Sequence, residues 1–118
     1  MSCNLIAFST PTLKVQERSS MAVTARFRDR AAADVTPTNV SYRLDSAEGN
    51  WGNCELLGWT SGTPGTTLAI TITPEQNRIL NDARALETRY LTVASDKGLS
   101  TEYRETLRYQ VRNEAYAD

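Results

Sequence analysis

The stretch Thr67–Thr73 reads TLAITIT and alternates apolar with small or hydroxyl side chains without a break. Leu68, Ile70 and Ile72 therefore fall on one face, and the residues between them fall on the other. This period of two is typical of a strand that buries one face and exposes the other. An all-β fold is the first hypothesis that it supports.

The same alternation recurs along most of the chain. The further alternating segments are residues 13–16, 21–28, 40–45, 57–59, 89–93 and 103–111. A turn precedes the last of them and contains Gly98, which tolerates a positive φ. Seven or eight short strands separated by turns predict an all-β fold, a β-sandwich of two sheets.

One connection carries the signal of a helix start. Thr73 can act as the N-cap before Pro74, and Gln76 stands where it can close a capping box with Thr73. Asn81 and Asp82 then favour local side-chain hydrogen bonds over continuation of the helix. We therefore expect one short helical crossover near residues 74–82.

The length of 118 residues corresponds to a single domain. The expected parts are an N-terminal arm or edge strand at 1–12, a β-sandwich domain at 13–114 and a C-terminal tail at 115–118. Leu5, Ile6 and Phe8 are apolar, so we expect them to contact either their own sandwich or a neighbouring chain.

The charges nearly cancel, since 13 basic and 14 acidic side chains give a net charge of −1. No global field favours nucleic acid, and no stretch approaches the ~20 apolar residues that span a bilayer. Residues 1–10 lack the pattern of a signal peptide, so we expect synthesis in the cytosol. Cys3 and Cys54 are the only cysteines, and we expect free thiols.

Histidine is absent, which removes His-dependent acid–base relays and most mononuclear zinc sites. Acidic side chains that could coordinate calcium are Asp29, Asp34, Asp45, Glu48, Asp96 and Glu102. They lack the regular spacing of a calcium loop, and such carboxylates commonly cap turns. We expect no enzymatic activity, no cofactor and no metal.

The two tryptophans receive different predictions. Trp59 shares the face of Leu57 in an alternating strand, so we expect it in the core. Trp51 stands between turn glycines, where we expect it on the surface and in contact with another protein rather than with a sugar.

The order of these elements is similar to that of the small stand-alone Ig-like proteins that tailed bacteriophages carry as virion components. The resemblance covers residues 20–114. It rests on the segments 23–29, 37–45, 59–60, 70–74, 87–93 and 109–113. The paired cysteines of antibody-type domains are missing here, so core packing must replace the bridge.

This resemblance implies an Ig-like β-sandwich of two antiparallel sheets, and it implies a virion structural protein. The role that we expect first is that of a capsid decoration or cement subunit. Such a subunit would bind the major capsid protein or another virion protein, in many copies or as a homo-oligomer. A tail or head–tail connector component is the neighbouring alternative. The alternative from a different class of function is an adhesion module that binds a host-surface glycan or protein.

The outward positions of three expected strands form a locally basic face. Its members are Arg43, Tyr90, Thr92, Arg104, Thr106, Arg108 and Arg112. Two interpretations remain open: a solvated sheet whose arginines discourage edge pairing, or a surface that docks on an acidic protein. The candidate partner-binding residues are Leu5, Ile6, Phe8, Arg43, Tyr90, Arg104 and Arg108.

Overall fold

The computed structural model describes residues 3–10, 12–49, 52–80 and 85–114 and contains eight strands there. They are β1 (Leu5–Ser9), β2 (Lys14–Gln16), β3 (Met21–Arg28), β4 (Val40–Gly49), β5 (Gly52–Gly62), β6 (Thr67–Ile72), β7 (Leu86–Ser95) and β8 (Tyr103–Arg112). No α-helix occurs in these ranges, and hence none that could cross a membrane.

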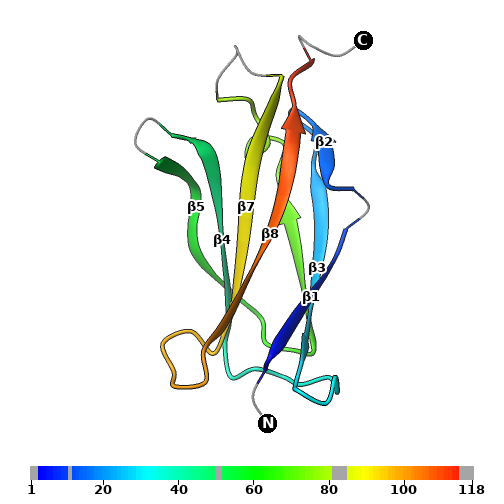
Figure 1. Ribbon diagram of the computed structural model, residues 1–118, viewed down its shortest axis with the longest axis vertical. Helices are drawn as coiled ribbons and strands as arrows, with labels where there is room; N and C mark the ends of the chain where they lie inside the picture. The colour runs from blue at the N-terminus through cyan, green and yellow to red at the C-terminus, as the bar shows by residue number, and fades with distance from the viewer. Residues whose placement is uncertain (1–2, 11, 50–51, 81–84, 115–118) are drawn as a thin grey trace.

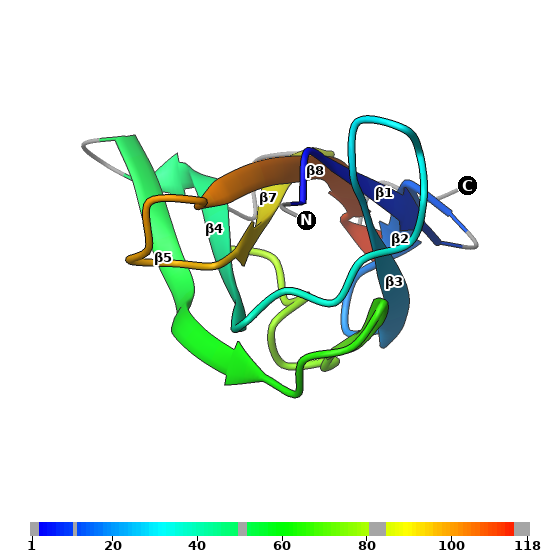
Figure 2. The same cartoon turned by 90° about the horizontal axis from the view of Figure 1, so that it is seen from below.

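The strands form a two-layered sandwich (Figures 1 and 2). One sheet has three strands in the order β1-β3-β6, and the other has five in the order β2-β8-β7-β4-β5. Neighbours pair antiparallel except β2 and β8, which run parallel, so the expectation of two purely antiparallel sheets is wrong at this one pairing. The distribution of strands between the sheets is Ig-like, and the predicted fold class is confirmed.

The alternating stretch behaves as its pattern predicts. Leu68, Ile70 and Ile72 of β6 are 6%, 3% and 2% exposed, and they face the core between the sheets. In β8 of the other sheet, Tyr109 and Val111 are fully buried and belong to the same core. Burial of these apolar faces is the main stabilising contribution to the sandwich, since each such side chain contributes about 1.5–3 kcal/mol.

The prediction of a helical crossover is wrong over the described residues 74–80. The capping box itself forms: the Thr73 N–H donates to Gln76 Oε1 (2.9 Å), and the Gln76 N–H donates to Thr73 Oγ1 (3.3 Å). The chain then makes a single turn over residues 74–77 and continues without helical structure over 78–80. Asn77 is fully buried and holds the segment down, because its amide donates to the Ser19 carbonyl at 2.8 Å. Asn81 and Asp82 lie outside the described residues.

The turn between β7 and β8 agrees with its prediction, since Gly98 has a φ of 85°. Asp96 fixes the turn to the rest of the sandwich: its carboxylate accepts the Thr38 N–H and the Thr101 hydroxyl, each at 2.7 Å. Asn39 adds two hydrogen bonds to the main chain of Lys97. The turn therefore presents the Lys97 side chain from a fixed backbone.

Candidate protein-docking face

Trp59 lies on the outer face of the five-stranded sheet, not in the core. Tyr42 pairs with Thr60 and Leu44 pairs with Leu57, so β5 has one more residue than β4 in this interval. Such a bulge reverses the alternation of the longer strand. Leu57 consequently packs against the core, whereas Trp59 stands on the outer side near Arg43.

Three cationic side chains surround the Trp59 ring. Lys97 Nζ and the guanidinium carbon of Arg104 each lie 5.0 Å from the ring centroid, and the guanidinium carbon of Arg43 lies 5.7 Å from it. All three distances fall within the ~6 Å range of cation–π attraction. We call Trp59, Arg43, Lys97 and Arg104 the tryptophan cluster.

Carboxylates hold Arg43 in place. Its Nε and one terminal nitrogen donate to the two Asp45 oxygens at 2.9 and 2.7 Å, a bidentate pair. Glu55 lies 3.7 Å from the same terminal nitrogen. The hydrogen bonds to Asp45, with the negative charges of Asp45 and Glu55, raise the pKa of Arg43. Its charge is thus permanent but largely balanced.

Arg104 pairs with the carboxylate of Glu102, whose Oε2 accepts from Arg104 Nε at 2.6 Å. The other Glu102 oxygen accepts the Gly98 N–H at 2.8 Å. The Gly98 hydrogen bond first, and the Arg104 hydrogen bond second, lower the pKa of Glu102. This carboxylate therefore stays ionised at neutral pH and orients Arg104 toward the ring of Trp59.

The face continues across β7 and β8 with smaller and singly charged side chains. Thr92 and Thr106 are opposite each other and share a hydroxyl hydrogen bond of 3.1 Å. Tyr90 is half-buried opposite the exposed Arg108. Neither Arg108 nor Lys97 has a carboxylate within ion-pair distance in the described part of the chain.

The structure therefore brings Arg43, Tyr90, Arg104 and Arg108 onto one face, as their alternation predicts. Pattern analysis missed the central Trp59 of that face. The only signal for its position is Gly58, since an isolated glycine inside a strand often marks a bulge.

The apolar N-terminal candidates lie elsewhere. β1 pairs antiparallel with β3 and is an edge strand of its own sandwich, the second of the two forms expected for this segment. Ile6 is 2% exposed, and Phe8 is half-buried and packs against the core, so both side chains contact their own sandwich. Leu5 is 39% exposed and faces outward.

The acidic side chains act as local acceptors. Asp29 Oδ1 accepts the N–H groups of Ala31 and Ala33, and Asp34 lies between Arg26 and Arg28 at 3.5 and 3.7 Å. Among the described residues no three Asp, Glu, Cys or His side chains cluster as metal ligands. The side chains of Glu48, Trp51 and Cys54 are outside the description, and Cys3 is a buried free thiol.

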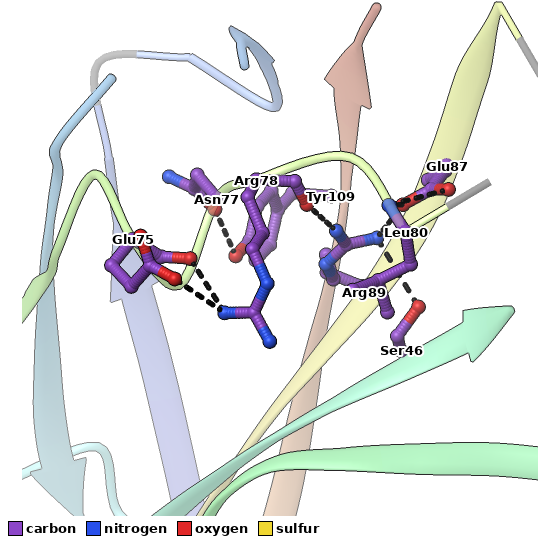
Figure 3. Close-up of polar contacts among 8 residues, drawn as sticks. All are labelled: Ser46, Glu75, Asn77, Arg78, Leu80, Glu87, Arg89 and Tyr109. Carbon is purple, nitrogen blue, oxygen red and sulfur yellow. Dashed lines mark hydrogen bonds and ion pairs between the residues drawn. The ribbon is translucent and has the colours of Figure 1, made fainter. Parts of the chain in front are cut away.

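A second polar cluster lies inside the sandwich (Figure 3). Glu87 and Arg89 are fully buried and form an ion pair of 2.8 Å. Arg89 also donates to the Arg78 carbonyl (2.6 Å) and to Ser46 Oγ (3.2 Å). Both oxygens of Glu87 accept the Leu80 N–H at 3.0 Å. These contacts tie the segment 78–80 to β7, and Ser46, Glu87 and Arg89 are fully buried.

No family model matches the chain, and no curated protein is similar to it in sequence. A solved β-glucosidase from Listeria innocua, in complex with gluconolactone, is 10% identical. The match covers 92% of this chain and 16% of that chain, with a TM-score of 0.42. A cohesin module from a family 33 glycoside hydrolase of Clostridium perfringens is 12% identical over 97% of this chain and 100% of that one, with a TM-score of 0.40.

Proposed function

We propose that this chain is a non-enzymatic structural module that docks on an acidic protein surface through the outer face of its five-stranded sheet. The observation that carries the proposal is the Trp59 ring, held on that face among Arg43, Lys97 and Arg104. Tryptophan and arginine are the side chains most enriched in interface hot spots.

The preorganisation of the cluster supports this function. Asp45 holds Arg43, Glu102 holds Arg104, and Asn39 and Asp96 fix the turn that carries Lys97. Little side-chain freedom is then lost on binding, which lowers the cost of association. Lys97 and Arg108 offer positive charge to acidic groups of a partner.

In line with the resemblance to Ig-like proteins of tailed phages, we place the module on the virion, as a capsid decoration subunit bound to the major capsid protein. A specific interface buries about 1,200–2,000 Å² in total, to which one sheet face contributes a share. Many copies on a lattice gain further from avidity.

The test is co-sedimentation of the purified chain with particles that lack it. Trp59→Ala should weaken association, and Arg104→Glu should weaken it and reduce the salt dependence of the remaining binding. Arg30→Glu is the matched control, since it makes the same charge change at an exposed position in the loop after β3. If all three variants co-sediment like the unmodified chain across a salt series, the tryptophan cluster is not the docking site.

Binding to isolated tails instead of capsids would make the chain a tail component.

A further inference from the structure

β6 is an edge strand whose outer hydrogen-bonding groups are open. The Phe27 N–H donates to the Thr66 carbonyl at 3.0 Å, which sets the phase of the antiparallel ladder. In this phase the N–H and C=O groups of Leu68, Ile70 and Ile72 point to β3. Those of Thr67, Ala69 and Thr71 point away from the sheet, and they make no backbone hydrogen bond to a described residue.

The other sheet edges are protected, whereas β6 is not. β2 is only 3 residues long, and β5 is interrupted by register shifts. β1 lies beside β8 of the opposite sheet. β6 contains no charge, proline or bulge, the devices by which edge strands usually avoid pairing.

We propose that two copies of this chain pair along β6, antiparallel about Ala69, and so join their three-stranded sheets into one continuous sheet. The outward side chains of β6 are self-complementary in this register. Thr67 of one copy lies opposite Thr71 of the other, and Ala69 lies opposite Ala69. Threonine pairs across antiparallel strands are favourable, and no charge is placed opposite a like charge.

The outward side chains of β3, the strand next to β6, are also compatible with this two-fold symmetric pairing. On β3, Arg26 stands beside Thr67 and Ala22 stands beside Thr71. The two-fold axis therefore sets Arg26 of one copy in the same row as Ala22 of the other, and Arg26 already has Asp34 as a partner at 3.5 Å. No repulsive pair arises along the joined face.

An open hollow of about 450 Å³ lies on the same side of the sandwich. It lies between the end of β5 and the start of β6, and its lining includes Tyr42, Gly62, Pro64 and Leu68. Pairing along β6 brings the hollows of both copies toward the contact and removes part of their apolar lining from water. The proposal concerns the three-stranded sheet and does not depend on the docking face.

The first experiment is sedimentation equilibrium of the purified chain over a concentration series. The unmodified chain should reach twice its mass of 13.1 kDa as concentration rises. Ala69→Lys sets two like charges opposite each other and should raise the dimer dissociation constant about tenfold or more. Ala22→Lys is the matched control, since it makes the same change at an exposed position one strand inward, and its dissociation constant should stay near that of the unmodified chain.

The second experiment separates pairing from folding. Ala69→Pro removes only an N–H that points away from β3, so the variant should keep its circular dichroism spectrum and lose the dimer. A mixed sample of two isotope-labelled forms should show contacts between the Hα of Leu68 in one copy and the Hα of Ile70 in the other. A monomer at all concentrations, or a dimer that both Ala69 variants retain, would overturn the proposal.

Discussion

Glu87 and Arg89 form a fully buried ion pair on the inner side of β7, and their partners include main-chain groups of Arg78 and Leu80. Arg89→Met removes the positive charge that Arg89 supplies to the Glu87 carboxylate in a site of low dielectric. Loss of one member of such a pair costs about 3–5 kcal/mol. We expect this loss in the free energy of unfolding, measured by chemical denaturation with circular dichroism.

The double variant Glu87→Leu with Arg89→Met is the informative comparison. It removes both charges and fills the space with apolar atoms, which is often neutral or stabilising relative to a buried pair. Its loss should therefore be smaller than that of Arg89→Met alone. Equal losses in the single and double variants would mean that the contacts of Arg89 with Ser46 and Arg78 matter more than its charge balance with Glu87.

Tyr109 links the protein's stability to pH. Its hydroxyl donates to Asn77 Oδ1 at 2.8 Å, and burial raises the pKa of the phenol above its usual value. The neutral phenol is thus favoured in the folded state, whereas the unfolded phenol ionises near pH ~10. The contribution is fully present below pH ~10 and is lost as pH rises further.

Tyr109→Phe should cost about 1–3 kcal/mol near pH 7, because Asn77 Oδ1 loses its donor. Between pH 9 and 11, chosen to bracket that ~10 value, its unfolding free energy should fall less steeply than that of the unmodified chain. Parallel curves for the two proteins, measured by urea denaturation at each pH, would show that Tyr109 is not the residue that couples folding to alkaline pH.

At the scale of the element, β1 is a structural strand and not a free arm. Ile6 is 2% exposed and faces Phe27 across the ladder, whereas its neighbour Leu5 is 39% exposed. Ile6→Ala should cost about 2–5 kcal/mol of unfolding free energy. Leu5→Ala, the matched control, should change it by less than about 0.5 kcal/mol. A similar melting temperature for both variants would contradict the burial of β1 in its own sandwich.

Alternation sufficed to predict most strands, because it determines which face of a strand is buried. It placed Leu68, Ile70 and Ile72 inside, and Arg104 and Arg108 outside. Two bulges in β5 break the rule, and one of them moves Trp59 to the surface, although only Gly58 marks the irregularity in the sequence. Where a bulge occurs depends on pairing with β4, which the sequence of β5 alone does not contain.

The alternation rule also predicts the burial of two charged residues, although their charge argues against it. Glu87 and Arg89 share the parity of Leu91 and Val93, so alternation alone places them inside. Charged residues are rarely buried unless they are paired, which favours the opposite assignment. The capping box at Thr73 likewise forms, but buried Asn77 ends the turn before a helix can propagate. In each case a tertiary contact decided between two local preferences.

At the scale of the whole molecule, the two proposed contact surfaces belong to different sheets. The tryptophan cluster covers the outer face of the five-stranded sheet, and β6 is an edge of the three-stranded sheet. Pairing along β6 therefore leaves the tryptophan cluster of each copy uncovered. A dimer of this kind presents two docking faces, which increases avidity for a surface that repeats the same acidic site.

Because the two surfaces lie on different sheets, each contact can be disrupted by mutation without affecting the other. Trp59→Ala should weaken co-sedimentation with particles but leave the dimer dissociation constant unchanged, since Trp59 lies on the other sheet. Ala69→Lys should raise the dimer dissociation constant and keep the intrinsic affinity of a single docking face. Its binding to particles should fall only through lost avidity, and a binding curve against isolated capsid protein should match that of the unmodified chain. If Ala69→Lys weakens binding to the isolated protein as strongly as Trp59→Ala does, the β6 edge is itself part of the docking surface.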